Sequence, residues 1–224
     1  MAASSGVARP IYPFRIKFNA TGVAQSQRIS EKTAQTFLQG TPVQIDVAGA
    51  TGFIIACPAI VSVATANIAG FAQENGHNLA TSGGQTGGPL DLQLNPPASG
   101  GIGVILSTGQ GVPNQPSASV MPIGAPQVFG SVGLWVADEV TTYIGVYGDS
   151  STAANAVLAQ AQVGAIRGLT KDAGNNFWYV DNFLVTAATG ACVEIVSLVS
   201  PIGTLNGLVE FKVFRAAQQL GGQN

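Results

Sequence analysis

The chain has 224 residues, of which 46% are hydrophobic and only 9% are charged, and its formal net charge is −2. This length accommodates one large β domain, or two small ones that share a core, without help from disulfides or metals, and a hydrophobic chain with little net charge is not intrinsically disordered. Because unpaired charges are costly to desolvate, the scarcity of charge favours a surface that packs against other molecules; a low-charge soluble monomer is the alternative.

The first segment of the chain, residues 1–32, is cationic. It carries five cations against the single anion Glu31, a net charge of +4. The cations are Arg9, Arg15, Lys17, Arg28 and Lys32. The next stretch, residues 33–166, contains no Lys or Arg and carries six acidic side chains. This asymmetry predicts a positive arm that docks on an acidic partner, including a neighbouring copy of the same body; a solvated tail is the alternative.

We predict that residues 1–40 form this N-terminal arm together with a short helical turn. Phe14, Ile16 and Phe18 alternate with cations and would share one face of a strand, with both cations on the other face. Ser30 is the candidate N-cap of the helical turn, which would end near Leu38.

The rest of the chain, residues 41–224, is predicted to form a β body, either as one unit or as two sub-domains that meet near residues 107–131. Short apolar or alternating runs separated by Gly, Pro and Asn predict about a dozen strands and long loops at 74–89 and 107–127. The predicted strands are 43–47, 53–55, 60–63, 68–71, 90–94, 102–106, 132–136, 140–147, 163–169, 177–180, 192–199 and 208–214. This pattern indicates an all-β fold, an antiparallel barrel or sandwich that is jelly-roll-like.

Two further local predictions follow from the same reading. In the last strand, Val209, Phe211 and Val213 are expected to face the core, with Glu210 and Lys212 outward as a pair on one face. Residues 152–162 are rich in Ala and uncharged, which makes them the best helix candidate in the chain.

Residues able to perform chemistry are few. His77 is the only histidine, and no G-x-S-x-G motif supports a Ser-His-Asp site around it. Asp138 and Glu139 are adjacent, which predicts a solvated turn rather than a pair of catalytic carboxylates. Cys57 and Cys192 lie in apolar runs and are expected to be buried free thiols in a protein that folds in a reducing cytoplasm. We therefore expect no enzymatic activity, no cofactor and no metal site.

Nucleic acid and membrane are not expected as partners. Nucleic-acid binding requires a basic face, and the body of this chain is acidic. The uncharged stretch 47–72 is interrupted by Gly, Pro and Asn, so it predicts short buried strands rather than a membrane span. Residues 1–6 lack the pattern of a secretory signal.

Two groups of short motifs run through the chain in order. The first comprises SEKTAQTF at 30–37, GTPVQI at 40–45 and IAGFA at 68–72. The second comprises VGAIRGLT at 163–170, FWYVD at 177–181 and VEFKV at 209–213. In this order they resemble the capsid decoration, or cement, proteins of tailed bacteriophages. The resemblance covers residues 28–72 and 163–214, while residues 74–127 match less clearly.

The resemblance implies a homotrimer on the outer surface of a phage head, assembled in the host cytoplasm. Such a protein binds the major capsid protein at three-fold or local three-fold junctions and holds capsomers together against the pressure of packaged DNA. The family has no enzymatic activity and no cofactor.

The partner-binding residues predicted for this role are the arm cations Arg9, Arg15, Lys17 and Arg28. Deletion of residues 1–20 is expected to leave the body folded and to weaken capsid binding. Two other functions remain as alternatives: a tail-tube or fibre component, and a secreted adhesin or carbohydrate-binding module. The last would usually present exposed aromatic rings, whereas Trp135 and Trp178 are predicted to lie in strands and pack in the core.

Overall fold

The structure is a computed structural model of the whole chain, and it describes the larger part of it. The described residues are 9–16, 24–30, 35, 37–47, 52–61, 68–76, 92–93, 105–106, 131–172, 174, 177–186 and 190–220. Within these residues the fold is all-β and mostly antiparallel, which confirms the predicted fold class.

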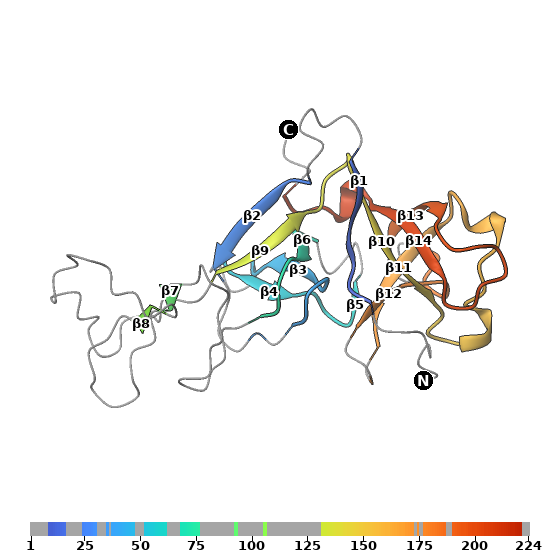
Figure 1. Ribbon diagram of the computed structural model, residues 1–224, viewed down its shortest axis with the longest axis horizontal. Coiled ribbons are helices and arrows are strands. Elements are labelled where there is room, and N and C mark those ends of the chain that lie inside the picture. The colour runs from blue at the N-terminus through green and yellow to red at the C-terminus, as the bar shows by residue number, and fades with distance from the viewer. Residues whose placement is uncertain are drawn as a thin grey trace, which may run out of the picture.

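The described strands form two main sheets and a small ribbon (Figure 1). The seven-stranded sheet contains β1 (Tyr12–Ile16), β5 (Ile60–Val61), β10 (Thr141–Gly148), β11 (Ile166–Lys171), β12 (Trp178–Asp181), β13 (Ala191–Leu198) and β14 (Leu208–Val213). The five-stranded sheet has the order β2 (Ser26–Ser30), β9 (Ser131–Val136), β6 (Gly70–Ala72), β3 (Pro42–Ile45) and β4 (Ile54–Ala56). The ribbon pairs β7 (Leu92–Gln93) with β8 (Ile105–Leu106).

In the larger sheet the strand pairings run in a closed circuit. β10 pairs with β12, β12 with β11, β11 with β13, β13 with β14, and β14 returns to β10. All these pairs are antiparallel except β10 with β12, which run parallel over a short stretch. β1 and β5 are added outside the circuit, on β10 and β11 respectively. The circuit leaves part of its strand edges open, because β12 pairs only with Tyr147 and Gly148 of β10. β1 pairs with residues 141–144 of β10, and β5 pairs with Leu169 and Thr170 of β11.

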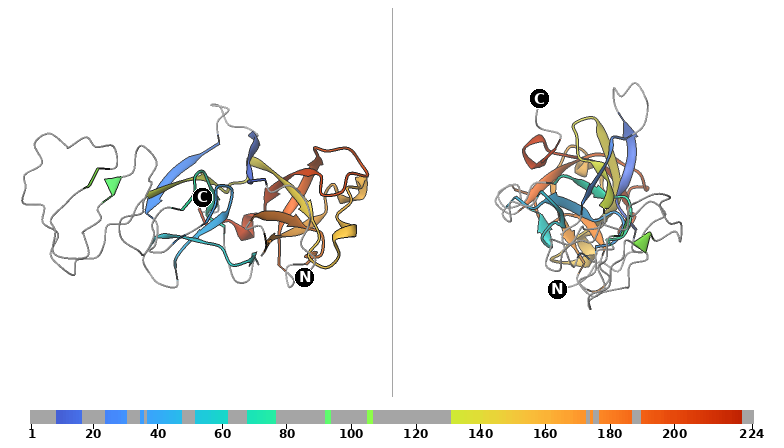
Figure 2. Two further views of the ribbon diagram at one scale, coloured as in Figure 1. Left: turned by 60° about the horizontal axis from the view of Figure 1, so that its bottom comes forward. Right: turned by 90° about the vertical axis from the view of Figure 1, so that its left-hand side faces the viewer.

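The five-stranded sheet is open, with β2 and β4 at its edges, and it lies beside the larger sheet (Figure 1 and the left view of Figure 2). The chain passes from one sheet to the other between β9 and β10. Asp138 makes this turn, because its carboxylate accepts the backbone N–H groups of Val140 and Thr141. Glu139 is exposed and pairs with Arg215 at 3.2 Å, so the predicted solvated turn is confirmed.

Strand β6 contributes side chains to both cores. Ala72 packs in the core of the smaller sheet with Val43 and Leu134, whereas Phe71 belongs to the larger core. The Phe71 ring lies 4.4 Å from the ring of Tyr143 and 6.0 Å from that of Phe211, measured between centroids. Aromatic contacts at these distances stabilise beyond their buried area. The two sheets therefore share an aromatic junction.

The predicted strands each overlap an observed one, and one strand was missed. β2 has the sequence Ser-Gln-Arg-Ile-Ser, in which Ile29 is the only apolar side chain, so no hydrophobic pattern marks it. Ser30, the predicted N-cap, pairs with Ser131 at the end of β2. Most of the helical turn predicted from there to Leu38 lies outside the described residues.

The helix predicted over 152–162 is wrong. Two short 3-10 helices, η1 (Ala153–Asn155) and η2 (Gln160–Gln162), occupy the ends of this segment. Between them Val157 forms an antiparallel bridge with Leu205, and the N–H of Leu158 bonds to the carbonyl of Thr204. These tertiary pairings override the helical propensity of the alanines.

The described parts of the predicted arm belong to the two sheets. β1 pairs with β10 and β2 pairs with β9, and Ile11, just before β1, is fully buried in the larger core. Deletion of residues 1–20 would therefore remove a strand and a core side chain. We replace the expectation of an unperturbed body by one of substantial destabilisation.

Candidate partner-binding surface

The four cations predicted to bind a partner differ in their surroundings. Arg9 is exposed just before β1, Arg15 lies in β1 and Arg28 lies in β2. Lys17 lies outside the described residues. The structure therefore places Arg9 and Arg15 on one N-terminal segment and Arg28 on an edge strand of the other sheet.

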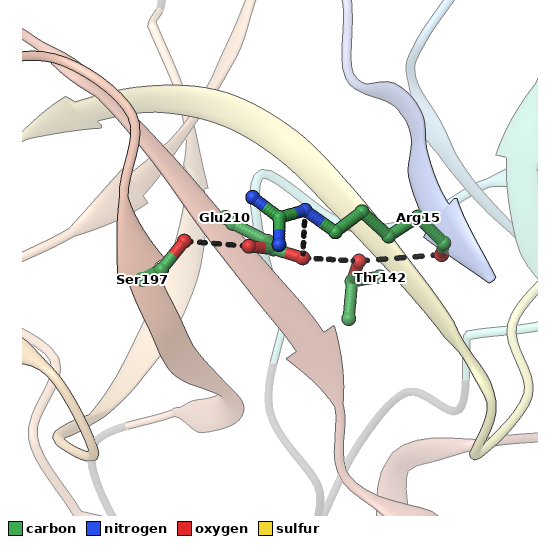
Figure 3. A network of polar contacts seen from close by, with 4 residues as sticks. All are labelled: Arg15, Thr142, Ser197 and Glu210. Atoms are coloured by element: carbon green, nitrogen blue, oxygen red, sulfur yellow. Dashed lines mark hydrogen bonds and ion pairs between the residues drawn. The ribbon is translucent and has the colours of Figure 1, made fainter. Parts of the chain in front are cut away.

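Arg15 forms an ion pair with the buried carboxylate of Glu210 (Figure 3). Its Nε lies 3.4 Å from Oε1 of Glu210, whose side chain is only 3% exposed. The hydroxyl of Thr142 donates to the same oxygen at 2.7 Å, and the hydroxyl of Ser197 donates to Oε2 at 2.5 Å. Each of these four residues comes from a different strand, β1, β10, β13 or β14. The network therefore ties β1 to three strands of the circuit.

This arrangement corrects the prediction for the last strand. Val209, Phe211 and Val213 do face the core, as expected. Glu210, however, is buried on the opposite face beneath Arg15, and Lys212 pairs instead with Glu194 at 3.0 Å. Alternation correctly predicted that Glu210 lies on the face of β14 opposite the core, but it could not show that Arg15 of β1 covers this side chain. A buried carboxylate needs hydrogen bonds and an opposite charge, and the network supplies both.

Arg28 is also held within the molecule. Its guanidinium lies 3.0 Å from Oε1 of Glu74, which also accepts the backbone N–H of Gly133 at 2.8 Å. Nearby, the Gln73 amide donates to the Ser26 hydroxyl at 2.7 Å. These contacts fasten the edge strand β2 to the segment after β6. An ion pair that is half open to solvent contributes modestly, so its role here is to orient β2.

The surface around β1 carries aromatic as well as cationic side chains. Tyr12 and Phe14 are both exposed, and the Arg15 guanidinium carbon stands 5.0 Å from the centre of the Phe14 ring. We call Arg9, Tyr12, Phe14 and Arg15 the N-terminal surface. The strict alternation predicted for residues 14–18 is interrupted at its start, because the register with β10 shifts between Pro13 and Arg15. Pro13 was the available sequence signal.

Other carboxylates in the described part of the chain serve turns. Asp149 accepts the N–H groups of Ser151 and Thr152, and Asp181 accepts those of Ser150 and Phe183. Both are buried, and they stand near the ends of the parallel pair β10 and β12. No group of three His, Cys, Asp or Glu residues among the described ones could hold a metal ion. His77 lies outside the described residues.

Cys57 and Cys192 are free and buried in the larger core, as predicted. Burial raises the pKa of the Cys192 thiol to about 12, and burial followed by the proximity of Cys192 raises the pKa of Cys57 well above its usual value. Thiols held neutral in this way are poor nucleophiles. Their chemistry is that of small apolar side chains.

The tryptophans do not form an exposed platform. Trp178 is buried, and Trp135 is half-buried against the larger core. No helix in the described ranges has the length and hydropathy needed to cross a membrane.

The fold and surface define a mostly antiparallel, all-β protein with a cationic and aromatic N-terminal surface. Comparison with protein-family models, with curated proteins and with solved structures found no match.

Proposed function

We propose that this chain is a structural decoration protein of a bacteriophage head. It binds the outer capsid surface at three-fold or local three-fold junctions of the major capsid protein, and it stabilises the shell without enzymatic activity. Its copies act as a homotrimer. The sequence motifs in residues 28–72 and 163–214 support this role, as does a surface that carries few charges.

The observation that carries the proposal is the N-terminal surface. Arg9 offers an exposed positive charge, and Tyr12 and Phe14 offer exposed rings beside it. Aromatic and arginine side chains are the residues enriched in the energetic centres of protein interfaces. A capsid groove with acidic and apolar side chains would complement this surface.

The Glu210 network gives this surface a mechanical role. A force applied to β1 is transmitted through Arg15 and Thr142 to Glu210, and from there to Ser197 on β13. Binding through the N-terminal surface therefore loads the five paired strands of the circuit and not a loose tail. Many copies that each bind moderately would then reinforce the shell collectively.

The test is binding to purified capsids that lack the protein. Arg9 and Lys17 are changed together to Ala, while Arg15 and Arg28 are kept because they hold Glu210 and Glu74. We expect occupancy after co-sedimentation to fall several-fold and the remaining binding to depend less on salt, because two charges are lost.

The matched control is Arg215→Ala, which removes an exposed cation that pairs with Glu139 outside the N-terminal surface. It should bind capsids as the unmodified protein does. Failure of the unmodified protein to bind any capsid would refute the proposed function. Equal occupancy for the double variant would refute the part assigned to the arm cations.

A further inference from the structure

One end of the larger sheet presents a surface without ionisable side chains. It is built from residues 150–166 and 195–209, neither of which contains Asp, Glu, Lys, Arg or His. We call these two segments the uncharged end. Figures 1 and 2 show them together at the extremity of the molecule that points away from the five-stranded sheet.

Backbone pairing holds the two segments side by side. Val157 bridges Leu205, and Leu158 and Gly203 exchange hydrogen bonds with the facing segment. Further along, the N–H of Gly164 bonds to the carbonyl of Ile195 at 2.8 Å. The uncharged end is therefore a defined, paired surface rather than two separate loops.

Apolar side chains are concentrated there. Seven of the thirteen large hydrophobic side chains that are exposed among the described residues belong to it. Ile202 is 63% exposed and Leu205 is 50% exposed. Contiguous exposed apolar surface with a polar border marks an interaction site in a soluble protein. The Lys212–Glu194 ion pair supplies part of that border, since Glu194 pairs with Ile166 across β13 and β11.

We propose that the uncharged end is where copies of this chain meet around a rotation axis. Close to such an axis a surface meets its own symmetry copies, so any charge on it would face a like charge. A surface with no ionisable group avoids this repulsion and loses little on desolvation. A charged partner would find no opposite charge to pair with on the uncharged end. The chemistry of this surface thus matches a second copy of itself.

This contact is distinct from capsid binding, which is assigned to the N-terminal surface. The inference rests on the homotrimer of the proposed function and assigns its contact surface. It does not depend on capsid binding, so purified protein is enough to test it. Loss of capsid binding with self-association intact, or the reverse, would tell the two proposals apart.

The experiment measures molar mass by light scattering over a concentration series from about 1 to about 100 µM, the range of moderate affinities. The purified chain should form trimers as its concentration rises. Ile202→Asp combined with Leu205→Asp should weaken this association by about ten-fold or more. Both side chains are exposed, and circular dichroism of the dilute variant should match that of the unmodified chain.

Two controls complete the design. Val47→Asp introduces the same charge at an exposed valine beside the smaller sheet and should leave association unchanged. Ile202→Leu keeps the apolar surface and should also associate normally. A chain that stays monomeric throughout the series would overturn the inference. So would a folded double-Asp variant that associates as tightly as the unmodified chain.

Discussion

The two sheets solve the problem of strand edges differently. In the larger sheet five strands form a closed circuit, and the N-terminal strand β1 is fastened outside it through buried Glu210. The smaller sheet is open, and its edge strand β2 is fastened through a half-exposed pair, Arg28 with Glu74. In both sheets an arginine on an N-terminal strand pairs with a carboxylate, but the carboxylate is buried in the larger sheet and partly exposed in the smaller one.

The sheets are nevertheless coupled through one strand. Phe71 on β6, a strand of the smaller sheet, packs among aromatic rings of the larger core. The hydroxyl of Tyr143 on β10 donates to the carbonyl of Val136 on β9, which joins the sheets at a second point. Stability should therefore be shared across the junction rather than divided between two independent units.

The largest expected effect comes from breaking this junction. Phe71→Ala removes a fully buried ring from the shared core and should lower the free energy of unfolding by about 3–5 kcal/mol. Both sheets should then unfold in one transition, because they share this core. Chemical denaturation followed by fluorescence and circular dichroism checks this, with Phe183→Ala, at an exposed phenylalanine, as the control. Two separate transitions in the unmodified chain would contradict the coupling.

The second effect compares a buried carboxylate paired with an arginine, Glu210, with an exposed one, Glu139. Glu210→Ala leaves the hydroxyls of Thr142 and Ser197 and the Arg15 guanidinium without their acceptor, so we expect a loss of about 1–3 kcal/mol. Glu139→Ala removes an exposed pair with Arg215 and should cost less than about 1 kcal/mol. Thermal unfolding of the two variants gives the comparison. Equal losses of stability in the two variants would show that burial of Glu210 does not make its contacts more stabilising than those of exposed Glu139.

The third effect is a pH dependence of the shared core. The raised thiol pKa values mean that the folded state keeps the protons on Cys57 and Cys192 while the unfolded state loses them above its own thiol pKa. The thiol contribution to stability is then fully present below about pH 8.5 and is lost progressively as pH rises above it. Urea titrations at several alkaline pH values measure the slope.

A matched variant isolates the thiol contribution. Cys192→Ala should make the fall of the unfolding free energy with pH less steep, by the contribution of one thiol. At higher pH, tyrosines with raised pKa values also contribute to this fall. In the folded protein neither cysteine should react with a thiol reagent at neutral pH, and both should react after unfolding. Rapid labelling of the native protein would show that the core is open to solvent.

The sequence was sufficient to predict the all-β class and nearly every strand, because alternating or apolar runs such as 208–214 mark buried faces directly. It could not predict β2, because this strand is held by pairing with β9 and by polar contacts with distant residues and carries no hydrophobic pattern of its own. The failed helix at 152–162 has the same origin, since contacts with residues 203–206 decide its structure.

The candidate site was harder to predict than the fold. Charge counting found Arg9, Arg15 and Arg28, but it could not distinguish an exposed cation from one committed to Glu210 or Glu74. Those carboxylates lie 195 and 46 positions away along the chain, so only the folded arrangement brings them together with their partners. Tyr12 and Phe14 were not predicted to be surface partners of the cations, because strict alternation was assumed across Pro13, where the register shifts.

The most direct test of the proposed structural role is electron cryo-microscopy of phage particles purified from the source of this chain. The account predicts β-rich density that fits this structure on the outside of the head, at three-fold or local three-fold junctions, with the N-terminal surface against the major capsid protein. Density for the chain in the tail alone, or its absence from purified particles, would contradict the account.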